Sequence, residues 1–161
     1  MYIKGRMKTK QDDLSDIVYI REKVFQEELD IPKSLEEDDN DKNAEFAVVY
    51  KVVDIPQGED EKPVATGRLI VDADGNYKIG RIAVLPEERG NQYGDMIVKM
   101  LINKAFTIGA NEVYVGAQTH AIGFYEKMGF VSTGVEYNEL GRKHLKMFIK
   151  STATLRECKN V

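Results

Sequence analysis

Residues 86–97, PEERGNQYGDMI, are of types that can bind an anion. Gly90 and Gly94 let the backbone approach a bound group closely, and the apolar periodicity that follows predicts a helix. The first N–H groups of a helix are unpaired and its N-terminus carries about half a positive charge, so pyrophosphate is a common guest. Arg89 could add a charge-assisted contact. The same residues would also suit an ordinary turn between a strand and a helix.

The segments around this loop predict an α/β fold. Alternating apolar residues predict strands over residues 2–8, 44–54, 64–72, 77–85, 112–118, 130–139 and 144–150. Helical spacing predicts helices over residues 12–29, from the loop to about 108, and over 121–128, while the polar segments 30–43 and 55–63 are expected to be a loop and a turn. The three strands between 44 and 85 should form an antiparallel meander, with Asp74-Gly75 as a hairpin turn.

These elements imply a mixed, mostly antiparallel central sheet of about seven strands with helices on both faces. Ligands of such sheets tend to bind beyond strand ends, at the point where neighbouring strands diverge. The loop at residues 86–97 follows such a strand end.

The composition is that of a globular protein. The 161 residues are 42% hydrophobic and 31% charged, and they show no repeat, low-complexity tract or linker, which favours one domain over residues 1–161. No apolar run approaches the roughly 20 residues that span a membrane, and the N-terminal segment lacks the apolar core of a signal peptide. The net charge of −4 argues against a nucleic-acid partner.

Cysteine and histidine usage points to a cytoplasmic protein without a metal site. Cys158 is the only cysteine, so an internal disulfide is not expected, which fits a reducing compartment. The two histidines, His120 and His144, lie far from it in the sequence and lack the spacing of zinc ligands.

Two motifs resemble signatures of the GNAT superfamily of N-acetyltransferases. Residues 82–101, IAVLPEERGNQYGDMIVKML, are similar to its acetyl-CoA signature, a hydrophobic strand followed by Q/R-x-x-G-x-G/A and an apolar helix. Arg89 and Gly94 match the first and last positions of the glycine pattern. Residues 117–130, AQTHAIGFYEKMGF, resemble the second signature, with matches at Phe124, Tyr125, Lys127, Gly129 and Phe130. Residues 21–32 and 136–150 resemble a bacterial subgroup of similarly short, single-domain chains.

The resemblance spans most of the chain and implies acetyl-CoA as acetyl donor, with coenzyme A as product. The strand before the loop would pair its backbone with the pantetheine, and the loop would donate N–H groups to the pyrophosphate. The implied cofactor-binding residues are Ile82, Ala83, Val84, Arg89, Gly90, Asn91, Gln92, Tyr93, Gly94, Asp95, Phe124 and Lys127.

This sequence departs from the pattern at Gln92, which occupies the position of the middle glycine. Because the loop donates backbone groups, Gln92 is tolerated if its backbone lies in an ordinary region. Otherwise the strain could cost about 1 kcal/mol. Phe124 is expected to line the pantetheine wall or the core, and Lys127 could equally contact a phosphate or only solvent.

Tyr125 is the candidate catalytic residue. In the family that it resembles, this tyrosine faces the thioester sulfur and can protonate the departing thiolate. A phenol with a reference pKa near 10 is protonated at neutral pH and can act as an acid. The alternative is a tyrosine whose ring packs on the sheet.

A general base would be needed to take the proton of the attacking amine, and the candidates are Glu22, Glu27, Glu28, His120 and His144. The glutamates could instead form a solvated helix end, His120 could cap a helix, and His144 could be a strand histidine whose hydrogen bonds are satisfied. The acidic run at residues 36–42, EEDDNDK, could be merely solvated or could attract a cationic acceptor.

Two functions from different classes are therefore open. The first is an acetyl-CoA-dependent N-acetyltransferase in which a primary amine, on a small molecule or peptide, attacks the thioester directly. The second is a non-catalytic module that binds or senses acyl-CoA, which the departure at Gln92 would suit. A homodimer is compatible with either.

Overall fold

The computed structural model describes residues 1–151, and Cys158 lies outside this range. Seven strands form one sheet in the order β1-β2-β3-β4-β5-β7-β6. The strands are β1 (Tyr2–Lys8), β2 (Glu45–Ile55), β3 (Gly58–Val71), β4 (Tyr77–Val84), β5 (Glu112–Gln118), β6 (Val131–Glu139) and β7 (Arg142–Lys150). The α-helices are α1 (Ser15–Arg21), α2 (Lys33–Glu36), α3 (Tyr93–Thr107) and α4 (Ile122–Lys127).

The remaining helical segments are short. They are the π-helix η1 (Glu22–Glu28) and the 3₁₀ turns η2 (Asp39–Asn43), η3 (Pro86–Glu88) and η4 (Thr119–Ala121). None of the helices within residues 1–151 has both the length and the apolarity needed to cross a membrane.

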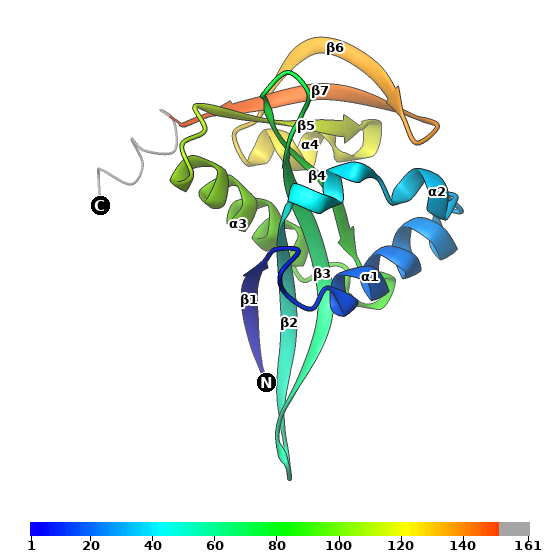
Figure 1. The fold of residues 1–161 in the computed structure, drawn as a ribbon, viewed down its shortest axis with the longest axis vertical. Coiled ribbons are helices and arrows are strands. Elements are labelled where there is room, and N and C mark those ends of the chain that lie inside the picture. Colours follow the sequence, from blue (N-terminus) through cyan, green and yellow to red (C-terminus); the bar gives the residue numbers. More distant parts are fainter. Residues whose placement is uncertain (152–161) are drawn as a thin grey trace.

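The sheet is mixed and mostly antiparallel, as expected. Only β4 and β5 run parallel to each other, and β2, β3 and β4 form the expected antiparallel meander. Figure 1 shows α1 and α3 on opposite sides of the central strands, so helices cover both faces of the sheet.

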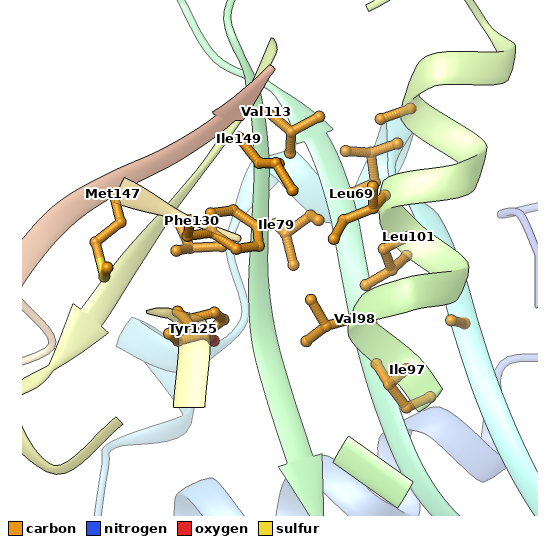
Figure 2. Close-up of a cluster of buried hydrophobic side chains, with 14 of the residues drawn as sticks. Leu69, Ile79, Ile97, Val98, Leu101, Val113, Tyr125, Phe130, Met147 and Ile149 are labelled. Atoms are coloured by element: carbon orange, nitrogen blue, oxygen red, sulfur yellow. The ribbon is translucent and has the colours of Figure 1, made fainter. Parts of the chain in front are cut away.

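Strand β2 explains how two cores form. Its residues alternate, so Phe46 and Val48 pack with α1 and η1, whereas Ala47 and Val49 belong to the cluster beneath α3. Figure 2 shows the cluster beneath α3, in which Leu101 of α3 points toward Leu69 of β3. Full burial of one such aliphatic side chain contributes about 1.5–3 kcal/mol.

The first helix differs from the expected one over residues 12–29. Regular α-helix ends at Arg21, and the chain continues in wider π-turns to Glu28. Leu29 N–H therefore donates to the carbonyl of Val24 at 3.0 Å, five residues earlier. Such π-turns are rare and often lie at functional sites.

The two polar segments also contain more structure than expected. Residues 30–43 include α2 and η2, and residues 55–63 are mostly strand, because β2 runs to Ile55 and β3 starts at Gly58. The hairpin therefore projects beyond the sheet (Figure 1). Side chains of β1 contact this hairpin: Arg6 and Lys4 both donate hydrogen bonds to Glu61 of β3, Lys4 at 3.1 Å.

The acidic run at residues 36–42 is divided: Glu37 and Asp39 are exposed to solvent, whereas Glu36, Asp38 and Asp41 are held by arginines. Glu36 is fully buried and pairs with Arg21. Arg68 donates to both Asp38 and Asp41 at 2.7 Å. Burial alone would raise the pKa of Asp38, but the hydrogen bond and charge of Arg68 outweigh it and lower this pKa to about 2.

Candidate active site

A gap between two neighbouring strands forms the centre of the site. β4 and β5 pair only where Tyr77–Ile79 lies beside Val113–Val115, and the strands then diverge. The register of β4 against β3 shifts between Thr66 and Arg68, and Arg81 has a positive φ of 51°. This bulge bends β4 away from β5. A cavity of about 600 Å³ opens in the gap.

Four parts of the chain line this cavity. They are η1 with the residues just after it, most of β4, the segment from β5 to α4, and the hairpin of β6 and β7, and β3 adds Arg68 and Ile70. Most of the lining is apolar, and charged side chains of both signs stand among the apolar ones.

The three strand residues of the acetyl-CoA signature, Ile82, Ala83 and Val84, all line the cavity. Leu85 N–H donates to Val64 of β3 at 3.0 Å, so the alternation of a strand turns the polar groups of Val84 toward the open side. Its carbonyl accepts a bond from Arg89 Nε at 3.2 Å. An extended ligand could still pair with the remaining polar groups of this strand edge, which face the gap.

The predicted loop borders a second cavity, of about 560 Å³. Of the predicted cofactor-binding residues, the following line it: Val84, Arg89, Gly90, Gln92, Tyr93, Gly94, Asp95, Phe124 and Lys127. The first intrahelical bond of α3 runs from Met96 N–H to Gln92 at 3.1 Å, so the N–H groups of residues 93–95 precede the helical ladder. Asn91 does not line the cavity, and its side-chain amide donates to the carbonyl of Glu88 at 3.0 Å.

Gln92 adopts a left-handed conformation, with φ 64° and ψ 21°. A glutamine at this glycine position was expected to be free of strain only with an ordinary backbone conformation, and Gln92 does not have one. Gly90 also has a positive φ, of 85°, which glycine adopts without strain. Only Gln92 carries the steric cost, of order 1 kcal/mol, at the turn into α3.

Arg89 connects the loop to the opposite wall of the larger cavity. Its guanidinium donates to both carboxylate oxygens of Glu28, at 2.7 and 2.5 Å. The hydrogen bond and charge of Arg89 lower the pKa of Glu28, which makes this carboxylate a weaker base. Arg89 lines both cavities, so it stands at their junction.

Tyr125 both lines the larger cavity and packs in the core. Its ring meets Phe124 and Phe130 edge to face, with ring centres 5.1 and 5.5 Å away. Figure 2 shows the rings of Tyr125 and Phe130 beside each other in the buried cluster. Burial, and secondarily the charge of Tyr137, raise the pKa of Tyr125 to about 12. The phenol is therefore protonated throughout the neutral range.

The candidate bases divide by location. Glu22 and Glu27 are exposed and do not line either cavity, and Glu27 pairs with Lys23 at 3.1 Å. Glu28 and His120 line the larger cavity, but Glu28 is held by Arg89 and His120 is exposed.

His144 is the buried candidate. Its Nδ1 lies 2.8 Å from the carbonyl of Arg142, which can only accept, so Nδ1 carries the proton. This tautomer leaves Nε2 able to accept a proton. The imidazole stacks on Tyr137 with ring centres 5.6 Å apart, which fixes its plane.

Several lining residues were missed by the sequence analysis. Gly116 on β5 has Tyr137 against it, since a Cβ at this position would lie 2.0 Å from the hydroxyl. A glycine inside a strand is a signal for close approach, but it does not reveal the partner. Lys99 borders the smaller cavity and pairs with Asp95 at 2.8 Å, a contact that the spacing of four residues could have indicated.

Comparison with known proteins identifies the family. The model of the acetyltransferase (GNAT) family matches residues 14–130. The uncharacterized N-acetyltransferase YjcF of Bacillus subtilis (strain 168) is 35% identical over 146 residues, which cover 90% of this chain and 98% of YjcF. The chain therefore belongs to the GNAT family and is an acetyltransferase, as the two signatures indicate.

Solved structures share the fold. A protein from Lactobacillus plantarum is 26% identical and superposes with a TM-score of 0.77, over 92% of this chain and 97% of that one. The PaiA N-acetyltransferase of Thermoplasma acidophilum, solved in complex with coenzyme A, is 14% identical with a TM-score of 0.66, over 93% and 99% of the two chains. These structures confirm that the expected sheet, with helices on both faces, is the GNAT fold.

Proposed function

We propose that this protein is an N-acetyltransferase that moves the acetyl group of acetyl-CoA to a primary amine. The observation that carries the proposal is the junction of two cavities. The one between β4 and β5 and the one at the loop share four lining residues, Val84, Arg89, Gly94 and Phe124. A long ligand with an anionic end can therefore run from the loop into the gap between the strands.

The loop supplies groups that suit a pyrophosphate. The unpaired N–H groups of residues 93–95 and the positive end of the 15-residue helix α3 favour an anion. Lys127 borders the same cavity and adds positive charge, whereas Lys99 is paired with Asp95. The pantetheine would follow the open edge of Ile82, Ala83 and Val84, with the thioester near Tyr125.

The reaction follows from this arrangement. The neutral amine attacks the thioester carbonyl, a C–N bond forms, and the tetrahedral intermediate carries an oxyanion that open backbone N–H groups of β4 stabilise. His144 Nε2 accepts the proton that the amine nitrogen loses. The C–S bond then breaks, and the phenol of Tyr125 donates its proton to the thiolate. Proton return from His144 through solvent restores both residues, and the products are an N-acetyl amide and coenzyme A.

We further infer that residues 1–161 act as one domain in the cytoplasm, which the lone cysteine of the sequence supports. The competing function is a module that binds acyl-CoA without turnover. Its one support is the strain at Gln92, at the position where the signature that this chain resembles has a glycine. The strain is of order 1 kcal/mol, too small to abolish binding or turnover.

A thiol-release assay separates the two functions. Purified protein is incubated with acetyl-CoA and a panel of primary amines, and free thiol is followed over time. We expect thiol release that depends on the amine and also a rise in melting temperature with acetyl-CoA, because a ligand of the folded state adds stability. A melting shift without thiol release for any amine would favour the binding module. No shift at millimolar acetyl-CoA would remove the cofactor assignment.

A further inference from the structure

Most charged side chains that line the larger cavity form ion pairs with other side chains of the protein. Lys78 and Arg81 both face Glu139, at 2.9 and 3.5 Å. Arg89 and Glu28 form the bidentate pair described above, with contacts of 2.5 and 2.7 Å. The two acids of the lining are therefore occupied, and neither is free to bind an ammonium group.

Arg68 is neutralised from behind the cavity. It donates to Asp38 and Asp41, both partly buried in the acidic segment that follows α2. Its charge is therefore already balanced before any ligand enters.

Arg142 is the exception within residues 1–151. No acid of this range lies within 4.0 Å of its guanidinium, and Nη2 donates only to the carbonyl of Leu29 at 3.5 Å, the limit for such a bond. A guanidinium carries five N–H donors, so most of those of Arg142 have no protein partner. The side chain is half-buried in a largely apolar cavity, where an unpaired charge is unfavourable.

The position of Arg142 relates this charge to the reacting groups. It begins β7, and its own carbonyl accepts the hydrogen bond from His144 Nδ1 at 2.8 Å. Its guanidinium reaches across to Leu29, just after η1, and Phe25 and Leu140 supply apolar surface to the same cavity. A guest between η1 and the β6–β7 hairpin thus meets an apolar wall, one unpaired cation, and His144 on the same strand.

We propose that the acceptor carries an anionic group, a carboxylate or a phosphate, which Arg142 binds while the amine of the same molecule is acetylated. This inference rests on the proposed N-acetyltransferase function and specifies its acceptor. The planar guanidinium can bind either anion through two parallel hydrogen bonds. An acceptor with a second ammonium group would instead meet a like charge and find no unoccupied acid in the lining.

Matched amines test the inference. One arm uses straight-chain ω-amino acids from 3-aminopropanoate to 8-aminooctanoate, a second uses alkylamines that lack only the carboxylate, and a third uses aminoalkyl phosphates of similar length. We expect the parent protein to favour an anionic series over its neutral counterpart by about 10–100-fold in kcat/KM, the range for a hydrogen bond to a charged group. The carboxylate and phosphate arms show which anion is preferred.

Variants at two neighbouring positions assign the effect. Arg142→Gln should abolish the preference, so that kcat/KM for the anionic series falls to that for the alkylamines, whereas Arg142→Lys should restore part of it by restoring the charge. Lys143→Gln is the matched control, because Lys143 is the next residue of β7, is 64% exposed and pairs with Glu136 at 3.0 Å. It should leave the preference intact.

The outcomes are distinguishable. Equal rates for anionic and neutral amines, or a preference that survives Arg142→Gln, would overturn the anion site and leave the enzymatic function standing. If no amine releases thiol, the proposed function fails, and calorimetric binding of 6-aminohexanoate and pentylamine to the protein saturated with coenzyme A decides the anion site. Tighter binding of 6-aminohexanoate that is lost in Arg142→Gln supports it, and equal binding of the two overturns it.

Discussion

Tyr125 is positioned by packing, which makes its chemical role separable from its structural one. Two edge-to-face contacts, with Phe124 and Phe130, hold the ring, and such pairs contribute about 0.5–1.5 kcal/mol each beyond area burial. Both contacts involve the ring alone. A phenylalanine at this position can therefore keep the packing and remove only the proton.

Tyr125→Phe should lower kcat on the order of 10–10³-fold and leave the affinity for acetyl-CoA nearly unchanged. The reason is that a proton donor acts in the transition state, and solvent can protonate part of the departing thiolate. Steady-state kinetics beside a melting curve checks this. A stable Tyr125→Phe protein with unaltered kcat would show that the tyrosine is structural and that backbone polarisation carries the reaction.

Gln92→Gly should keep or tighten acetyl-CoA binding with little change in melting temperature. Glycine removes the strain of φ 64°, and the greater freedom of glycine in the unfolded chain offsets about 0.4–1 kcal/mol of that gain. Gln92→Val should lower both stability and affinity, because a β-branched residue fits the left-handed region poorly. Calorimetric titration of acetyl-CoA into each variant is the measurement, and a Gln92→Val protein that binds as tightly as Gln92→Gly would contradict the assigned conformation.

Gly94 should tolerate a methyl group in the fold but not a larger side chain in the loop. A Cβ on Gly94 would lie 3.6 Å from Val84 and 3.9 Å from Phe124, which is ordinary contact. Gly94→Ala should therefore fold like the parent, whereas Gly94→Val should extend into the junction of the two cavities and weaken acetyl-CoA binding. If Gly94→Val bound acetyl-CoA like the parent, this loop would not hold the pyrophosphate.

At the scale of the elements, the divergence of β4 from β5 creates the site. Three residue pairs of parallel ladder hold the strands together at one end, and the bulge at Arg81 turns β4 away. The Glu28–Arg89 bridge then links η1 to the loop before α3, across the opening. Two elements far apart in the sequence are thereby fastened by one ion pair of half-exposed side chains.

Glu28→Gln should tighten acetyl-CoA binding about two- to fivefold by releasing Arg89 for the pyrophosphate. An exposed ion pair contributes only about 0.2–1 kcal/mol, which limits both this gain and any loss of stability. Glu27→Gln is the matched control, because Glu27 is 60% exposed and lines neither cavity. Weaker binding in Glu28→Gln alone would mean that the bridge supports the loop and does not compete for Arg89.

Local signals allowed the order of strands and helices to be predicted, because periodicity depends only on neighbouring residues. The features that were missed depend on distant contacts. Nothing near Arg81 in the sequence indicates a positive φ, and the β2–β3 hairpin contacts β1 through Glu61 and Arg6, which lie 55 residues apart. In the site, the loop and Tyr125 lie in recognisable motifs, whereas Arg142 faces Leu29 only because the fold joins residues 113 positions apart.

At the scale of the whole molecule, a group of ion pairs around three buried arginine side chains joins the first helix and the segment after α2 to the central strands β3 and β4. Arg21 of the first helix and Arg68 of β3 converge on Asp41, and Arg81 of β4 reaches Asp38 at 3.3 Å. The segment after α2 is thereby fixed to the bulged strand. Loss of a partner in such a group leaves a buried charge uncompensated, which is strongly destabilising.

This arrangement predicts a defined acid sensitivity. In the folded protein Arg68 holds the pKa of Asp38 at about 2, against a usual value of 3.8. Because the unfolded chain binds a proton at Asp38 more readily, the stabilisation is present above about pH 4 and is lost as the pH falls through 2. The loss should be on the order of 1–2 kcal/mol, since the carboxylate is partly exposed and screened by solvent. Urea unfolding midpoints from pH 6 to pH 2 measure it.

Asp38→Asn assigns this sensitivity to one carboxyl group. Asparagine can still cap η2, where Asp38 accepts from the N–H of Asn40, so the variant isolates the charge. It should be less stable than the parent at pH 6 and converge with it near pH 2. Asp39→Asn is the control, because its side chain is 96% exposed, and it should follow the parent at every pH. A constant gap between parent and Asp38→Asn down to pH 2 would show that shape, and not ionisation, accounts for the loss.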